Sequence, residues 1–140
     1  MAYMSQEHKK ELSPAIKALL KKYNIKGTIA VRNHSKLVVT IRSGVIDFMS
    51  NANDCLSVIR QRANGYAPND YTDYTDYIQV NVYSIDEHFA GIACEFLNEL
   101  RQAMYGARYY DNTDVQTDYF DCSHYIDISI GDWDKPYILE

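Results

Sequence analysis

A change in the spacing of apolar residues midway along the chain constrains the fold more than any other feature of the sequence. Residues 77–83 alternate between apolar and polar side chains, as in a β-strand with one buried face. From Phe89 to Met104, apolar residues recur three and four positions apart, which places them along one side of a helix. Ser84 and Glu87 have the spacing of a capping box at the start of that helix. A strand and a helix that each have one apolar face bury both by packing together.

The first part of the chain shows the same two patterns in the opposite order. An amphipathic helix with a basic outer side ends before Gly27. Pro14 leaves open whether this helix begins there or begins near residue 6 and bends. Alternating segments at 28–32 and 37–42, joined by a short polar link, predict a β-hairpin.

Two further elements complete the predicted order of helix, strand, strand, weak helix, strand, helix, strand. The weak helix lies within residues 47–65 with Asp54 as its cap, and the last strand spans residues 125–130. We therefore predict an α+β fold, a two-layer sandwich in which a mainly antiparallel sheet of about four strands carries helices on one face. The length of 140 residues fits a single domain, residues 1–140. The uncovered face is expected to carry Thr28, Arg32, Thr40, Arg42, Gln79, Asn81, Tyr83, Asp127 and Ser129.

Charge is distributed unevenly along the chain. Residues 1–46 contain nine Lys or Arg and two acids, whereas residues 47–140 contain five Lys or Arg and 17 acids. A surface of one sign steers partners of the opposite sign. The alternative is that the two halves simply attract each other within one fold.

Tyrosine is abundant, with 13 residues, and it gathers around two acidic segments. The first is a period-three run of Asp and Tyr at residues 70–77, and the second spans residues 109–121. Tyr supplies rigid, amphipathic contact area, so the two segments are candidates for a surface that binds a basic protein site. The alternative is a pair of solvated acidic loops. The candidate binding residues are Asp70, Tyr71, Asp73, Tyr74, Asp76, Tyr77, Tyr109, Tyr110, Asp111, Asp114, Asp118 and Asp121.

Other classes of site receive less support. Cys122 and His124, beside Asp121, are the only candidates for a nucleophile and its base, and no phosphate-binding loop or hydrolase motif is present. We therefore predict no enzyme activity and no cofactor. No zinc or calcium ligand spacing occurs, so we also predict no metal site. The three cysteines lack a CxxC motif, which favours a reducing cytoplasm. No apolar run is long enough to span a membrane.

Nucleic-acid binding is the main alternative function. The basic first helix and the hairpin would contact phosphates, and an aromatic ring on the sheet would stack on a base. The residues concerned are Arg32, His34, Lys36, Arg42 and Tyr83. The acidic remainder of the chain and its sequence pI of about 5.3 argue against this alternative.

Several short segments carry a family resemblance. They are the stretch from Ala15-Ile16-Lys17 to Lys26-Gly27-Thr28, then Val31-Arg32-Asn33-His34-Ser35, Leu37-Val38-Val39, Tyr119-Phe120-Asp121, His124-Tyr125-Ile126-Asp127-Ile128 and Trp133-Asp134-Lys135-Pro136-Tyr137. In these segments the chain resembles a large polyvalent protein-associated domain of phages and conjugative elements. The resemblance implies a mobile-element protein that acts in the cytoplasm of an infected bacterium and counters host defence.

These observations together predict a non-enzymatic inhibitor. We expect its acidic, Tyr-rich surface to bind a host nucleic-acid-handling complex of the CRISPR effector or restriction enzyme type, by occupying Lys and Arg that normally hold phosphate. The sequence also allows a homodimer formed through the polar sheet face or an edge strand.

Overall fold

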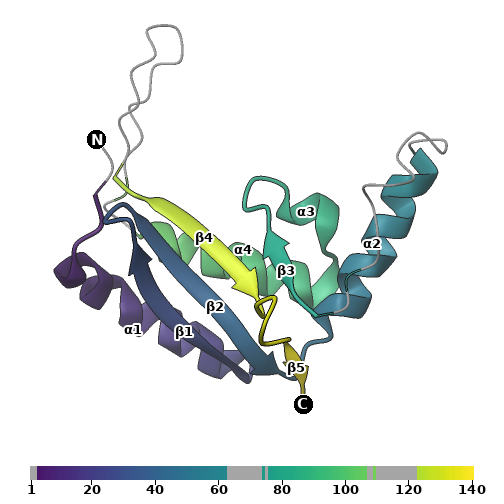
Figure 1. Ribbon diagram of the computed structural model, residues 1–140, viewed down its shortest axis with the longest axis horizontal. Coiled ribbons are helices and arrows are strands. Elements are labelled where there is room, and N and C mark those ends of the chain that lie inside the picture. Colours follow the sequence, from purple (N-terminus) through teal and green to yellow (C-terminus); the bar gives the residue numbers. More distant parts are fainter. Residues whose placement is uncertain (1–2, 63–73, 75, 107–108, 110–122) are drawn as a thin grey trace, which may run out of the picture.

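The computed structural model describes residues 3–62, 74, 76–106, 109 and 123–140, and it confirms an α+β fold with helices packed on a sheet (Figure 1). The helices are α1 (Gln6–Lys22), α2 (Phe48–Arg62), α3 (Ile85–His88) and α4 (Gly91–Tyr105). The strands are β1 (Ile25–Arg32), β2 (Lys36–Gly44), β3 (Ile78–Val80), β4 (Tyr125–Ile130) and β5 (Ile138–Leu139).

The sheet is mixed, with the strand order β1-β2-β4-β3 and with β5 joined to the end of β2. β1 pairs with β2 and β3 with β4 in antiparallel fashion, whereas β4 and β5 both run parallel to β2. The prediction of a mainly antiparallel sheet did not anticipate the parallel central pair. Alternation along a strand reports which face is buried, but it carries no information about the direction of the neighbouring strand.

The two long amphipathic helices α1 and α4 lie on the same face of the sheet and contact each other (Figure 1). The apolar stripe of each helix packs against the inward-facing residues of β2 and β4 in one core. The main contributors are Ile16 and Leu20 from α1, Phe96, Leu97 and Leu100 from α4, and Val39, Ile41, Ile128 and Ile130 from the strands.

The first helix begins at the earlier of the two predicted positions. Ser5 caps it, accepting a hydrogen bond from the backbone N–H of His8 at 3.0 Å, and Pro14 lies inside the helix. Pro14 has no N–H to donate, and the adjacent Ser13 hydroxyl donates to the carbonyl of Lys9 at 2.6 Å.

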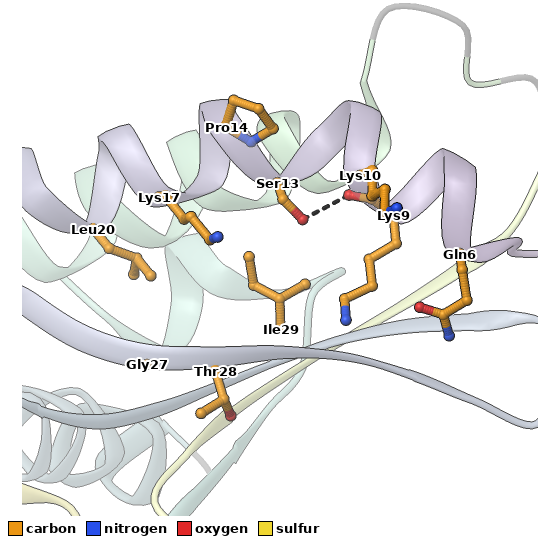
Figure 2. Close-up of a pocket in the computed structure, with 10 residues that line it drawn as sticks. All are labelled: Gln6, Lys9, Lys10, Ser13, Pro14, Lys17, Leu20, Gly27, Thr28 and Ile29. Atoms are coloured by element: carbon orange, nitrogen blue, oxygen red, sulfur yellow. Dashed lines mark hydrogen bonds between the residues drawn. The ribbon is translucent and has the colours of Figure 1, made fainter.

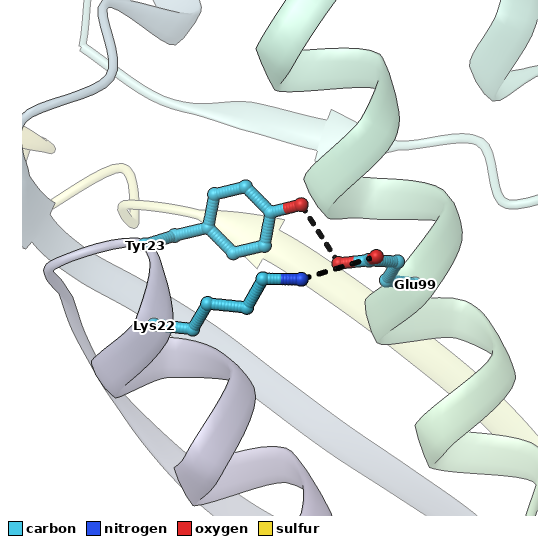
Figure 3. Close-up of polar contacts among 3 residues, drawn as sticks. All are labelled: Lys22, Tyr23 and Glu99. Carbon is cyan, nitrogen blue, oxygen red and sulfur yellow. Dashed lines mark hydrogen bonds and ion pairs between the residues drawn. The ribbon is translucent and has the colours of Figure 1, made fainter.

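The end of α1 is tied to α4 by one hydrogen bond and one ion pair (Figure 3). The Tyr23 hydroxyl donates to Glu99 at 2.7 Å, and the Lys22 ammonium lies 3.5 Å from the same carboxylate. The hydrogen bond to Glu99, together with desolvation and the charges of Glu99 and Glu95, raises the pKa of Tyr23 to about 12. The Tyr23 ring packs against Phe96 with centroids 5.1 Å apart.

The helix predicted over residues 84–104 is interrupted. The chain is extended at Phe89 and Ala90, which separates α3 from α4, and Ser84 makes no side-chain capping bond, so the capping-box prediction was wrong. Asn51 of α2 accounts for the break, because its side chain accepts from the N–H of Ala90 and donates to the carbonyl of Ala90, both at 2.9 Å. Ile92, which the sequence placed on the apolar stripe, is 56% exposed beyond this break.

Two other boundaries also differ from the predictions. Asp54 lies inside α2 rather than at its start, where Asp47 instead accepts a hydrogen bond from the N–H of Ser50 at 3.0 Å. The strand predicted over residues 77–83 pairs only as β3, and the two-residue β5 was not predicted. Short pairing at the edge of a sheet depends on which neighbour the fold supplies, and an alternating pattern does not reveal it.

Candidate functional site

Helix α2 holds the first acidic segment by hydrogen bonds to the backbone of Tyr74. Among the segment's predicted binding residues the structure describes Tyr74, Asp76 and Tyr77, whereas Asp70, Tyr71 and Asp73 lie outside the described residues. The side chain of Asn53 accepts a hydrogen bond from the N–H of Tyr74 at 2.7 Å and donates to its carbonyl at 3.0 Å. Both backbone groups of Tyr74 are therefore fixed to the helix.

The β4–β5 loop holds the same segment two residues further on. The N–H of Tyr137 donates to the carbonyl of Asp76 at 2.9 Å. Gly131 allows this approach, because its φ is +72° and a Cβ there would lie 2.6 Å from the Tyr137 nitrogen and 3.0 Å from the Asp76 carbonyl oxygen. Asn53 and Tyr137 together give the acidic segment a rigid base on the folded body.

Tyr137 in turn is anchored in the core. Its hydroxyl donates to the carbonyl of Ile46 at 2.7 Å, and its ring packs edge-on against Phe48 with centroids 5.4 Å apart. Burial is the main cause that raises the pKa of Tyr137 to about 12, with smaller contributions from the charges of Asp47 and Glu140. The loop that supports Asp76 is thus fixed to the protein interior.

The same loop adds aromatic and acidic side chains that sequence reasoning did not select. Trp133, the only tryptophan of the chain, is 80% exposed, and Asp134 beside it is exposed as well. Tyr77 is 46% exposed. A Trp between two Asp residues, at 132–134, was the available sequence signal. We call Tyr74, Asp76, Tyr77, Trp133 and Asp134 the acidic root.

The second acidic segment begins at a different place. Of its predicted residues the structure describes Tyr109, while Tyr110, Asp111, Asp114, Asp118 and Asp121 lie outside the described residues. The Tyr109 ring lies 4.3 Å from the Tyr105 ring and packs edge-on to His124 at 5.4 Å. This cluster is at the start of β4, whereas the acidic root is at its end, about 20 Å away at 3.3 Å per residue. The described residues of the two segments are therefore not brought together.

His124, considered above as a catalytic base, is fully buried. Its Nε2 lies 2.9 Å from the carbonyl of Met104 and its Nδ1 lies 3.0 Å from the Ser123 hydroxyl. The first bond requires a proton on Nε2, so the hydroxyl donates to Nδ1. Burial lowers the pKa of His124, the bond to Met104 raises it, and the nearby His8 lowers it further. Both ring nitrogens are occupied by structural hydrogen bonds, and Cys122 lies outside the described residues.

The residues of the nucleic-acid alternative are dispersed over the sheet. Arg32 and Lys36 are register partners at one end of the hairpin. Arg42 lies at the other end of β2 and forms an ion pair with Asp132 at 2.7 Å. Tyr83 follows β3, the strand at the opposite edge from β1. The fold does not gather the predicted set into one site.

A groove between α1 and β1 was not predicted as a site, although the basic side of the helix was visible in the sequence. It has a volume of about 740 Å³. Its helical wall carries Lys9, Lys10 and Lys17, and its floor is formed by β1 with Ile29 at its centre (Figure 2). Among the described residues, these three lysines form no ion pair.

Comparisons with known proteins add no relative. No family model, curated protein or solved structure matches this chain. Within the described ranges, no group of three or more His, Cys, Asp or Glu side chains is placed to hold a metal ion. None of the helices in the described part of the chain is long and apolar enough to cross a membrane.

Proposed function

We propose that this protein is a non-enzymatic inhibitor, encoded by a phage or other mobile element, that binds a host nucleic-acid-handling defence complex in the bacterial cytoplasm. The inhibitory surface is the acidic root together with Asp70, Tyr71 and Asp73, which precede it in the chain. Its carboxylates would pair with Lys and Arg side chains that otherwise hold phosphate, and its aromatic rings would supply desolvated contact area.

The observation that carries this proposal is the rigid attachment of the acidic root to the folded body. Asn53 holds Tyr74, and Tyr137 holds Asp76, so the exposed Asp76 and Tyr77 are presented from a fixed backbone. Preorganised contact groups lose less conformational entropy on binding than flexible ones. Exposed Trp and Tyr side chains are of the residue types enriched at interface hot spots.

The second acidic segment has a separate role in this proposal. Because its described end at Tyr109 lies at the other end of β4, it would contact a different part of a large target. The first segment is therefore the one to test first.

A protection assay with a charge-matched control tests the proposal. Cells that carry a CRISPR or restriction system are infected with a sensitive phage, with and without the protein, and the efficiency of plating is measured. We expect Asp70→Asn, Asp73→Asn and Asp76→Asn together to abolish protection. The control combines Glu7→Gln, Glu87→Gln and Glu95→Gln, three exposed carboxylates outside the root, and should keep protection.

The purified components give a second readout. Binding of the purified CRISPR or restriction complex to the wild-type protein should weaken as the salt concentration rises from about 0.05 M to about 0.5 M, since exposed charge pairs are screened. Equal protection by the root variant and the control would exclude the first acidic segment from the mechanism. If the wild-type protein and all variants failed to protect the phage against any of the systems tried, the inhibitor function would be excluded.

A further inference from the structure

The outer edge of β1 is open for pairing. Among the described residues, β1 is the first strand in the sheet order and pairs only with β2. Within the described part of the chain, no hydrogen bond from outside the β1–β2 ladder reaches the backbone of residues 25–31. Alternate residues of an edge strand direct their N–H and C=O groups away from the sheet, where they are available to another extended chain.

The lysines on the helical wall of the groove beside this edge have a spacing along α1 that matches an extended peptide. Lys9 and Lys17 are eight residues apart on α1, which is about 12 Å at 1.5 Å per residue. Their ammonium groups point from the helix toward β1, and the Ile29 side chain rises between them (Figure 2). In an extended chain, residues four apart lie about 13 Å from each other on the same face.

From this geometry we propose that the groove binds an extended acidic peptide, which adds to the sheet as a strand beside β1. Two carboxylates four residues apart pair with Lys9 and Lys17, and an apolar residue midway between them packs on Ile29. The recognised pattern is acidic–x–apolar–x–acidic. Main-chain hydrogen bonds to an edge strand supply affinity, and alternate side chains supply specificity.

The chemistry of the site favours a peptide over other occupants. A nucleic acid would satisfy the lysines but has no main-chain N–H and C=O ladder to match the edge of β1. A second copy of this chain paired through its own β1 would bring Lys9, Lys10 and Lys17 of both copies close together, and like charges oppose such pairing. An acidic strand satisfies both the edge and the lysines.

This inference is independent of the proposed inhibitor function. The acidic root adjoins β3, which is the strand at the other edge of the sheet. The two surfaces carry opposite charge and use different residues, so the failure of one proposal leaves the other standing.

Fluorescence anisotropy with synthetic peptides tests the site on the full chain. The probe is a labelled, capped heptapeptide, Thr-Glu-Thr-Val-Thr-Glu-Thr, at low ionic strength. One control replaces both Glu by Gln, and a second moves the later Glu by one position, which turns it to the opposite face. We expect the probe to bind at least fivefold more tightly than either control, and its binding to slow amide hydrogen exchange in residues 25–31.

Paired protein variants complete the test. Lys9→Gln with Lys17→Gln should weaken probe binding about fivefold, as expected for the loss of two exposed ion pairs. Lys21→Gln with Lys135→Gln changes the net charge equally outside the groove and should have no effect. Circular dichroism checks that both variants keep their helices.

Three results would overturn the proposal. The first is equal binding of the probe and the shifted control, and the second is probe binding without added protection of β1 amides. The third is tighter binding of a single-stranded oligonucleotide, if the Lys9 and Lys17 variant also loses it, because the groove would then be a phosphate site.

Discussion

Asn53 of α2 fixes both backbone polar groups of Tyr74, twenty-one residues away in the chain. Asn51, two residues earlier on the same helix, holds Ala90 in the same manner. One helix therefore positions two distant segments through identical side chains, one at the acidic root and one at the break between α3 and α4.

This pair of asparagines provides a matched test of the acidic root. Asn53→Ala keeps a good helix former in α2 but releases Tyr74, so we expect a loss of about 1 kcal/mol in unfolding free energy. Hydrogen exchange at the Tyr74 amide should accelerate, and protection against host defence should fall although every carboxylate remains. Asn51→Ala loses two equivalent bonds and should cost a similar free energy, while Tyr74 exchange and protection stay at wild-type levels. Equal protection by both variants would mean that rigid presentation does not matter for function.

Gly131 lies where the β4–β5 loop approaches the acidic root, so a substitution there should disturb the base of the root. An added Cβ would meet the Tyr137 nitrogen at 2.6 Å while φ stays at +72°, so Gly131→Ala combines a steric clash with backbone strain. We expect a loss of about 2–4 kcal/mol in urea unfolding. Gly91→Ala is the control, because Gly91 has a similar φ of +59° but open space around it, and should cost only about 1 kcal/mol. Equal losses at both positions would argue against the close approach of the loop.

His124 makes stability depend on pH in the acidic range. Its folded-state pKa is lowered, mainly by burial, so its stabilising contribution is present above the unfolded pKa of about 6.5 and is lost as pH falls. His124→Phe leaves the Met104 carbonyl and the Ser123 hydroxyl unpaired and should cost about 1–3 kcal/mol at pH 7.5. The difference in unfolding free energy between wild type and His124→Phe, measured by urea unfolding, should narrow as the pH falls to 5.

A second histidine serves as the control for the loss of the buried ring. His34 is exposed, and because its φ is +56°, Asn is the replacement that fits the backbone. His34→Asn should leave the free energy of unfolding at pH 7.5 close to the wild-type value, because it removes an exposed side chain. A gap at His124 that stays constant from pH 7.5 to pH 5 would show that this histidine does not titrate differently in the folded state.

Tyr23 makes the stability of the fold depend on pH in the alkaline range. Its folded-state pKa is raised to about 12, so the contribution of its bond to Glu99 is complete below the unfolded pKa of about 10 and is lost as pH rises toward 12. Tyr23→Phe keeps the ring on Phe96 but removes the donor, and should unfold at a lower urea concentration at pH 8. This difference should shrink above pH 10. Tyr83→Phe, at an exposed ring, should match wild type at pH 8, and a Tyr23 difference that persists unchanged at pH 11.5 would contradict the assignment.

The local pattern of the sequence was sufficient to predict the layers of the fold, but not every exposed position, because Thr40 and Ser129, expected on the uncovered face, are buried. The stripes that contain Ile16 and Leu20 in α1, and Phe96 and Leu100 in α4, are the faces that pack on the sheet. The hairpin turns where the polar link predicted it, with Asn33 and His34 both at positive φ. Apolar periodicity is a property of neighbouring residues, so it survives any arrangement that buries the same face.

The tertiary structure decided which segments meet. The parallel pairing of β2 with β4, the break at Ala90, and the approach of the β4–β5 loop to Asp76 each depend on backbone groups far apart in the chain. The open edge of β1 beside the lysines of α1 is likewise a consequence of strand order. Hydrogen-bonding groups of the backbone are nearly identical at every residue, so sequence pattern alone does not select their long-range partners, and only the packed fold does.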